Sequence, residues 1–351
     1  MKSALTSILL TTTLLLSLFS TVSLSGQDNQ YKIAAVGFYN VENLFDTINT
    51  IDVWDTEFTP EGSKGWNTTK YEEKLANLCY VINDMGTEKV RGGLSILGVS
   101  EIENITVLED LVNHPNLKEK DFGIVHHDSP DERGIDVALL YRKKHFKVTN
   151  SKPYFVDISP PNKTNYTRDI LLVSGELDGD PMHFLVNHWP SRSGGEKRSE
   201  PGRAKAGDVA KHIIDSLNIL EVNAKIILMG DLNDNPTNKS LVDHLGAKNK
   251  LRSVKKQEMY NPMADLFKKG YGSNAWRDTW SLFDQVIVSE GLLNKKAEGF
   301  QFHKAGIHNK KYLIQSIGQY KGYPYRTFVG DAFQGGYSDH FPVYVYLVKK
   351  V

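Results

Sequence analysis

One short segment constrains the fold of this chain more than any other. An apolar run, Ile226 to Gly230, is followed directly by the polar sequence Asp231-Leu232-Asn233-Asp234-Asn235-Pro236. The run is typical of a buried strand, and the Asp, Asn and Pro residues cannot continue it. The strand must therefore present Asp231 and Asn233 at its carboxyl end, where α/β proteins commonly place functional groups. Taken alone, the segment is equally compatible with an Asx-rich turn that leads into a helix.

Composition limits the classes of protein that this chain can represent. The chain has 351 residues, 40% hydrophobic and 24% charged, which is typical of one large α/β domain or two small ones. Its 42 basic and 42 acidic residues balance, so any contact with nucleic acid must be local rather than driven by net charge. Cys79 is the only cysteine, which excludes an internal disulfide, and it occupies an apolar position of a helix pattern.

The N-terminus has the layout of an export signal. Lys2 precedes an apolar run from Ile8 to Phe19, and small residues follow at positions 23–26. We therefore expect residues 1–25 to be a signal peptide that is cleaved near residues 23–26, and the protein to be secreted or periplasmic. The mature chain would then contain no transmembrane segment. An N-terminal anchor that stays attached is the alternative.

Hydrophobic periodicity predicts an α/β fold. Helices are predicted at 69–82, 106–113, 203–217 and 238–245, the first with Thr69 and Glu72 as a capping box. Residues 247–278 are predicted to be loop, and 296–337 give no clear pattern. Strands are predicted at 33–39, 94–99, 122–125, 137–141, 168–177, 182–188, 226–229, 281–288 and 342–348. Without a linker or repeat, residues 26–351 are expected to form a single domain, a four-layered α/β/β/α sandwich of two mixed sheets with helices outside.

Polar residues of complementary types follow or interrupt these strands. Several have ordinary explanations: Asn40 could cap a strand end, and His188 and His340 could be satisfied core histidines. Two acids are harder to explain in that way. Glu101 directly follows a buried run, and Asp284 lies within an apolar strand, where an unpaired carboxylate is costly. The set comprises Asn40, Glu101, His188, Asp231 with Asn233, Asp284, and Asp339 with His340.

Six motifs occur in order along the chain. They are Phe38-Tyr39-Asn40-Val41-Glu42-Asn43, Gly98-Val99-Ser100-Glu101-Ile102, Val186-Asn187-His188-Trp189, Met229-Gly230-Asp231-Leu232-Asn233, Phe283-Asp284-Gln285-Val286-Ile287-Val288-Ser289 and Ser338-Asp339-His340-Phe341-Pro342-Val343. Together they resemble the motifs of the endonuclease/exonuclease/phosphatase superfamily. That superfamily includes pancreatic-type deoxyribonucleases, apurinic endonucleases, bacterial sphingomyelinases and inositol polyphosphate 5-phosphatases. The resemblance spans about residues 32 to 348 and implies the four-layered sandwich of that superfamily.

The resemblance also implies a metal site. Glu101 matches the metal carboxylate of the superfamily, with Asn40 beside it and Asp339 near the metal. Oxygen ligands suit a hard divalent ion, so Mg²⁺ is the expected cofactor, with Mn²⁺ or Ca²⁺ as alternatives.

Catalytic roles follow from the same resemblance. Asp231 matches the acid that orients or deprotonates the attacking water, and Asn233 the amide that binds a phosphoryl oxygen. His340 matches the catalytic histidine, with Asp284 as the carboxylate that fixes its tautomer and raises its pKa. His188 matches the second histidine of the nuclease and sphingomyelinase branches, a phosphate ligand or general acid.

Two arginines are weaker candidates for contacts to substrate phosphate. Arg133 lies in a sequence where Asp136 could support His188, although a surface turn is an equal explanation. Arg192, like the charged run at 197–205, could touch a polyanion. The mixed charges of that run are more typical of a solvated helix start.

The leading functional hypothesis is a secreted, divalent-metal-dependent phosphoesterase that hydrolyses phosphodiester bonds, an endonuclease acting on nucleic acid. The alternative is a phosphatase or phospholipase-C-like hydrolase of inositol phosphates or sphingomyelin. An inactive homologue used for binding is a third possibility, and the presence of every metal and histidine position argues against it. We expect a monomer with no stable protein partner.

Overall fold

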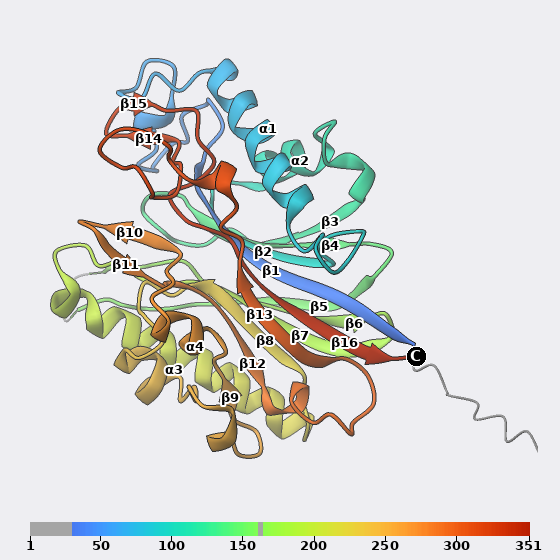
Figure 1. Ribbon diagram of the computed structural model, residues 1–351. Helices are drawn as coiled ribbons and strands as arrows, with labels where there is room; N and C mark the ends of the chain where they lie inside the picture. Colours follow the sequence, from blue (N-terminus) through green and yellow to red (C-terminus); the bar gives the residue numbers. More distant parts are fainter. Residues whose placement is uncertain (1–29, 161–163) are drawn as a thin grey trace, which may run out of the picture.

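Two six-stranded mixed sheets form the centre of the protein (Figure 1). The computed structural model describes residues 30–160 and 164–351, so the predicted signal peptide at 1–25 lies outside the described residues. The first sheet has the order β13-β16-β1-β2-β4-β3, with bounds Gln301–Ile307, Val343–Lys350, Tyr31–Leu44, Ile96–Ile102, Asp136–Arg142 and Phe122–His126.

The second sheet has the order β5-β6-β7-β8-β12-β9. Its strands are Phe146–Tyr154, Ile170–Leu177, Asp180–His188, Ile226–Asp231, Asp284–Ser289 and Met259–Tyr260. Two small hairpins pair β10 with β11 and β14 with β15, at Asn274–Trp276, Thr279–Ser281, Phe328–Val329 and Ala332–Phe333. The α-helices α1 to α4 are Thr68–Asp84, Ile105–Asn113, Glu196–Leu220 and Met263–Lys268.

Side-chain alternation along the central strands explains the layers. On β1, Ala34, Val36 and Phe38 belong to the core between the sheets, whereas Ala35 and Tyr39 belong to the core beneath α1 and α2. Successive side chains of a strand point to opposite faces, so a strand covered on both sides must be apolar on both.

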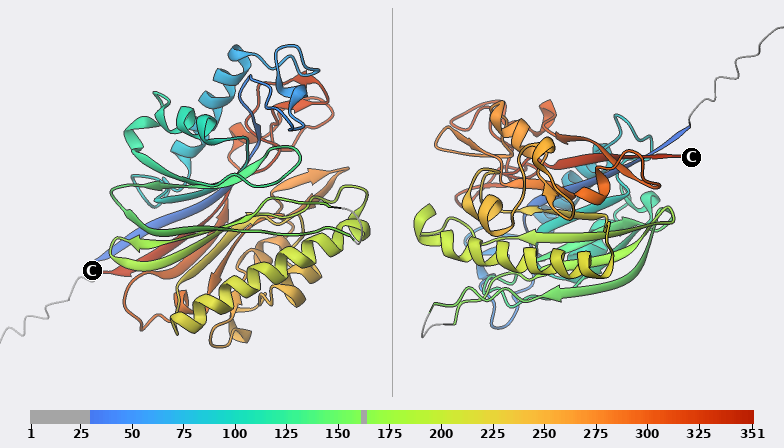
Figure 2. Two further views of the ribbon diagram at one scale, coloured as in Figure 1. Left: turned by 180° about the vertical axis from the view of Figure 1, so that it is seen from behind. Right: turned by 90° about the horizontal axis from the view of Figure 1, so that it is seen from below.

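The second sheet follows the same rule. On β8, Ile227 and Met229 face the first sheet, whereas Ile226 and Leu228 pack with the buried face of α3. Figure 2 shows α3 lying along the outer side of this sheet. The α/β sandwich predicted from the sequence is therefore confirmed. None of the helices within residues 30–160 and 164–351 combines the length and apolar character that a membrane crossing requires.

Helix starts differ from the predictions because side-chain contacts define them. Asn67, not Thr69, caps α1: its side chain accepts a hydrogen bond from the Lys70 N–H. The third helix begins at Glu196 rather than near Arg203, although Pro201 lies inside it. The buried guanidinium of Arg203 donates to the Glu196 carbonyl at 3.1 Å, which ties down the first turns of this helix.

Three stretches without a predicted helix or strand contain regular structure. The strand β5 was missed because its outward side chains are mostly polar, as is common at a sheet edge. The predicted loop at 247–278 contains β9, α4 and β10. Within the unclear stretch, β13 pairs with β16 at the edge of the first sheet, where a polar sequence is tolerated.

Candidate active site

The polar residues at the strand ends meet at one end of the two sheets. The strands β1 and β2 are parallel, with Asn40 opposite Ser100, and β7 and β8 are parallel, with His188 opposite Asp231. The strand β12 is antiparallel to β8 and starts with Asp284 opposite Asp231. An antiparallel strand begins where its neighbour ends, so residues far apart in sequence come together at this edge.

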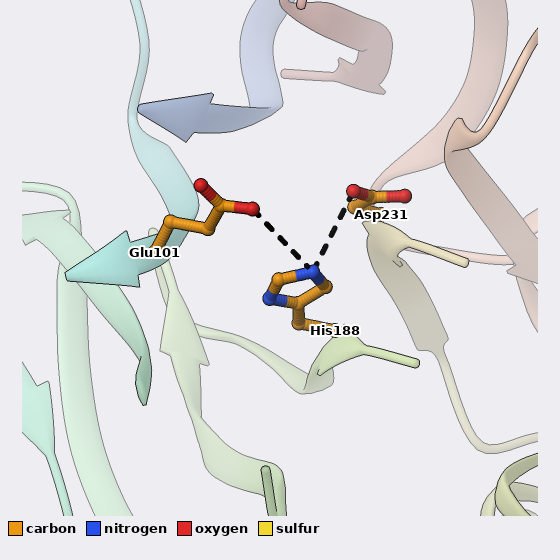
Figure 3. Close-up of side chains that lie close together, drawn as sticks. All are labelled: Glu101, His188 and Asp231. Carbon is orange, nitrogen blue, oxygen red and sulfur yellow. Dashed lines mark ion pairs between the residues drawn. The ribbon is translucent and has the colours of Figure 1, made fainter. Parts of the chain in front are cut away.

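Two carboxylates face one imidazole at the centre of this cluster (Figure 3). The His188 Nε2 lies 3.8 Å from Glu101 Oε1 and 3.6 Å from Asp231 Oδ2. The Asn40 Nδ2 donates to the same two oxygens, at 3.2 Å to Glu101 and 3.1 Å to Asp231. Because Asn40 and Glu101 come from the first sheet and the other two from the second, the cluster spans both sheets.

A histidine and carboxylate pair lies on the other side of Asp231. The His340 Nδ1 is 2.6 Å from Asp284 Oδ2, and its Nε2 is 3.9 Å from Asp231 Oδ2. Although burial lowers it, the pKa of His340 is raised well above its ordinary value by the carboxylates of Asp284 and Asp231. His340 is therefore held as a cation beside Asp231. A histidine must be protonated in this way to donate a proton or to bind an anion.

Left-handed backbone conformations cluster at the same place. Glu42, Asn43, Glu101 and Asn233 have φ angles of 52°, 53°, 62° and 50°. Such angles are uncommon for residues other than glycine and are found preferentially at functional sites. One result is that the Asn43 N–H turns to donate to Glu101 Oε2 at 3.0 Å, which fixes the carboxylate.

Asp231 is buried in a way that favours its neutral form. Burial raises its pKa to about 7; the His340 cation opposes the shift, whereas the carboxylates of Asp284 and Glu101 add to it. A carboxylate with a pKa near neutrality can both take up and release a proton under physiological conditions.

We expect the titration of Asp231 to report on metal binding. In metal-free protein its carboxyl group should titrate near pH 7. Saturation with Mg²⁺ should move the titration to lower pH, because a nearby cation favours the charged carboxylate. Carboxyl-carbon NMR shifts of labelled aspartate, followed against pH with and without Mg²⁺, measure this directly. An unchanged midpoint after Mg²⁺ saturation would contradict a cation site at this cluster.

Arg168 is a further candidate site residue, beside His188, that the sequence did not indicate. It is 6% exposed, and its guanidinium donates to the carbonyls of His188 at 3.2 Å and Trp189 at 2.8 Å. Burial lowers the pKa of His188 well below its ordinary value, and the cations of Arg168 and Arg133 lower it further. His188 is thus held neutral while His340 is held charged. The available signal was a charged residue at the start of an otherwise apolar predicted strand.

Two carboxylates offer the oxygen ligands that a hard divalent cation prefers. Potential ligand atoms of Glu101 and Asp231 lie within 4.8 Å of each other and of a ring nitrogen of His188. Asn40 is oriented differently from a metal ligand, because its Oδ1 accepts the Glu42 N–H at 2.9 Å and its Nδ2 faces the carboxylates. As placed here, Asn40 orients the two acids, and a ligand role would require its amide to turn round.

The profile of the Endonuclease/Exonuclease/phosphatase family matches residues 35–349. The chain belongs to this family. Among curated proteins no sequence match was found.

Solved structures of this family share the fold at low identity. A family protein from Bacteroides thetaiotaomicron is 18% identical, with a TM-score of 0.55 over 92% of this chain and 97% of that chain. The D. rerio TDP2 complexed with single-strand DNA product is 14% identical, with a TM-score of 0.52 over 90% and 98%. A mannosyl-6-phosphatase from B. thetaiotaomicron is 18% identical, with a TM-score of 0.51 over 90% and 99%.

Two other residues implied by the family resemblance lie at the border of the cluster. Asp339 is one third exposed, with Oδ1 3.9 Å from His340 Nε2 and Oδ2 3.8 Å from Arg326. Asn233 donates its backbone N–H to Asp231 and one amide hydrogen to the Trp189 carbonyl, both at 3.0 Å. Within residues 30–160 and 164–351, the second amide hydrogen of Asn233 has no acceptor.

Arg192 is committed to the protein rather than to the cluster. Its Nε donates to the Asn233 carbonyl at 2.9 Å, and its two terminal nitrogens pair with Asp234 at 2.9 Å and Glu196 at 2.8 Å. Each nitrogen of the guanidinium thus has a partner within the protein, and the predicted contact of Arg192 with substrate phosphate stays a prediction. The residue braces the loop that carries Asn233.

Arg133 and Asp136 have different surroundings in the structure. Arg133 is exposed, 3.8 Å from Asp131, and stays a candidate for a phosphate contact. Asp136 does not support His188; it pairs with His126 at 2.9 Å. The proximity of positions 133 and 136 in sequence was misleading because Asp136 already lies in β4 while Arg133 lies in the turn before it.

A buried ion pair holds the segment that carries His340. Lys74 of α1 is 1% exposed, and its ammonium donates to Thr327 Oγ1 at 2.5 Å and the Tyr337 carbonyl at 2.8 Å. Its partner Glu42 lies 4.0 Å away and accepts the Thr327 N–H at 2.7 Å. The pair therefore joins β1 and α1 to residues 327–337, which otherwise contribute only a short hairpin.

Replacing Lys74 by methionine should destabilise the protein by about 3–5 kcal/mol, the cost of leaving a buried charge without its partner. Urea denaturation measures the loss. The double variant Lys74→Met/Glu42→Gln should recover part of it, because the second change removes the unpaired charge. A single-variant loss under about 1 kcal/mol would show that the pair is no stronger than a surface ion pair.

Proposed function

We propose that this protein is a divalent-metal-dependent phosphodiesterase that hydrolyses nucleic acid. The observation that supports it most strongly is the meeting of Glu101, His188, Asp231 and His340 in one buried cluster of a family member. Two acids with a neutral and a charged imidazole supply the groups that phosphate ester hydrolysis needs: a proton acceptor, a proton donor and ligands for a cation.

We assign a role to each side chain. Asp231 accepts the proton of the attacking water, and its Oδ2 lies 3.6 Å from His188 Nε2 and 3.9 Å from His340 Nε2. The water oxygen bonds to phosphorus, the ester P–O bond breaks, and His340 gives its proton to the leaving oxygen. Asp284 keeps His340 charged and oriented until that transfer.

The remaining groups bind the phosphate. Neutral His188, beside Asp231, and the second amide hydrogen of Asn233 would donate to non-bridging oxygens. Glu101 would hold the cation, with Asn40 fixing its carboxylate. A bound divalent cation supplies neutralisation of the charge on the phosphoryl oxygens.

One side-by-side assay tests the proposal. Purified residues 26–351 with Mg²⁺, Mn²⁺ or Ca²⁺ are offered plasmid DNA, RNA, sphingomyelin, an inositol phosphate, mannose 6-phosphate and bis(p-nitrophenyl) phosphate. We expect cleavage of nucleic acid and of the chromogenic diester. Hydrolysis of monoesters alone would replace the proposal by a phosphatase, and no hydrolysis with any cation would refute a phosphoesterase.

We also propose that residues 1–25 direct export. The proposal rests on the Lys2 and Ile8 to Phe19 pattern, which lies outside the described residues. N-terminal sequencing of protein recovered after expression in a secreting host should find a start near residues 24–27. Recovery of full-length protein inside the cell would count against export.

A further inference from the structure

A large groove opens directly beside the candidate active site. It has a volume of about 1320 Å³, and Arg168 and Pro190 form part of its wall. Arg168 is also the residue that donates to the carbonyls of His188 and Trp189. We call this hollow the Trp54 groove; its lining residues include Trp54, Arg133, Thr167, Arg168, Arg198 and Lys205.

Cations outnumber free acids along the Trp54 groove. Arg133, Arg168, Arg198 and Lys205 line it, together with the acids Asp131, Glu132 and Asp157. Asp131 is already paired with Arg168 at 3.0 Å and lies 3.8 Å from Arg133. Arg198 and Lys205 are exposed on the first turns of α3, so their charges are accessible to a ligand in the groove.

The N-terminus of α3 adds the positive end of its helix dipole to the groove. This helix has 25 residues, and its N-cap, Gly195, makes no side-chain cap. Ser193 and Gly194, just before it, line the groove. Uncapped N–H groups and the helix dipole favour an anion at such a position.

A second observation points to a polar ligand at the same place. Thr167 lines the groove and is only 2% exposed, and its Oγ1 has no hydrogen-bond partner within the described residues. Buried hydroxyl groups are almost always paired, so an unpaired one at a groove wall indicates a partner from outside the chain.

An exposed indole lies at the groove. Trp54 is 70% exposed, and its backbone N–H donates to the Glu132 carbonyl at 3.0 Å, which fixes the loop to the turn before Arg133. A large aromatic ring held open to solvent beside cations is the combination that binds unpaired nucleotides, by stacking on a base and neutralising the backbone.

We infer that the Trp54 groove binds the single-stranded nucleic acid that flanks the scissile phosphodiester, with a base stacked on Trp54 and a neighbouring phosphate held by Arg198, Lys205 and the start of α3. The inference rests on the proposed function and specifies its substrate. A groove of this kind selects an unpaired, multiply charged strand over a monophosphate, because only the strand reaches both the cations and the indole.

Two groove variants and one matched control test it. Trp54→Ala removes the stacking surface, and Arg198→Ala/Lys205→Ala removes the two exposed cations. Arg252→Ala/Lys256→Ala makes the same charge change on an exposed segment outside the groove. None of these residues belongs to the Glu101, Asp231 and His340 cluster, so hydrolysis of bis(p-nitrophenyl) phosphate should stay within about twofold of wild type in all three.

Oligonucleotide kinetics should separate the variants. Each groove variant is expected to raise KM for a single-stranded oligonucleotide about tenfold, with kcat little changed, whereas the control stays at the wild-type value. The cation variant should also flatten the dependence of log KM on log salt by about 1.4, or about 0.7 for each lost phosphate contact.

Binding measured without turnover makes the inference independent of activity. Fluorescence anisotropy of a labelled oligonucleotide with Glu101→Gln, with and without the groove changes, should show the same loss of affinity. Unchanged KM and affinity in both groove variants would overturn the inference that the Trp54 groove binds nucleic acid. Hydrolysis of the chromogenic diester would in that case still support a phosphodiesterase. An equal loss of affinity for the oligonucleotide and for inositol hexakisphosphate, used as a competitor in the anisotropy assay, in the cation variant, with no effect of Trp54→Ala, would overturn the nucleic-acid assignment.

Discussion

Replacing His340 by alanine should lower kcat by about 10²–10⁴-fold, the usual contribution of a positioned proton donor. The imidazole is 2.6 Å from Asp284 and faces Asp231, and no other charged histidine is placed there among the described residues. Steady-state hydrolysis of bis(p-nitrophenyl) phosphate, with thermal unfolding to check the fold, measures the effect. His303→Ala, an exposed histidine of β13, is the matched control and should leave kcat unchanged.

Asp284→Asn distinguishes proton transfer from a merely structural role. Because Asp284 raises the pKa of His340, its loss should lower that pKa, and the alkaline limb of the kcat profile should move to lower pH. Residues that act as a unit are not additive, so the double variant should lose no more than His340→Ala alone. A fully additive double variant, or a pH profile unmoved by Asp284→Asn, would show that the two residues do not act together.

Glu101→Gln should lower kcat/KM by about 10²–10³-fold, the cost of losing a main source of charge stabilisation in the transition state. The change keeps the shape of the side chain and removes the charge that a cation requires. Reversible loss of wild-type activity with a chelator should accompany it. The rate measured against Mg²⁺ concentration tests the metal contribution directly.

Thermal stability gives a second readout for Glu101. Ligands that bind only the folded state raise the melting temperature, so Mg²⁺ should stabilise the wild type and have little effect on Glu101→Gln. Glu109→Gln, an exposed acid on α2, is the control and should behave as wild type. Equal stabilisation of both variants by Mg²⁺ would place the cation elsewhere.

Local patterns predicted the elements that carry the cluster. The Ile226 to Met229 strand ends at Asp231 because β-branched and apolar side chains stop there and the following residues favour turns. In β2 the apolar run was also predicted, and Glu101 lies within the strand, one residue before its end at Ile102. Polar edge strands were harder to predict. The sequence pattern missed β5 and β13 because side chains at sheet edges serve solubility more than packing.

Which residues contact one another within the cluster could be determined only from the fold. Asn40 and Asp231 are 191 residues apart in sequence, and His340 and Asp284 are 56 apart. The resemblance of motifs named His340 and Asp284 as partners, but it could not show that Arg192 pairs with Asp234 and Glu196.

The sequence by itself determined the layers and the types of side chain at the strand ends, because apolar periodicity and turn residues act over a few neighbouring positions. Only the tertiary structure decided which charges neutralise one another. It set Lys74 against Glu42, Arg168 beneath His188 and the amide of Asn40 toward the two acids. Electrostatic pairing depends on distance and burial in three dimensions, and neither can be read from the order of residues along the chain.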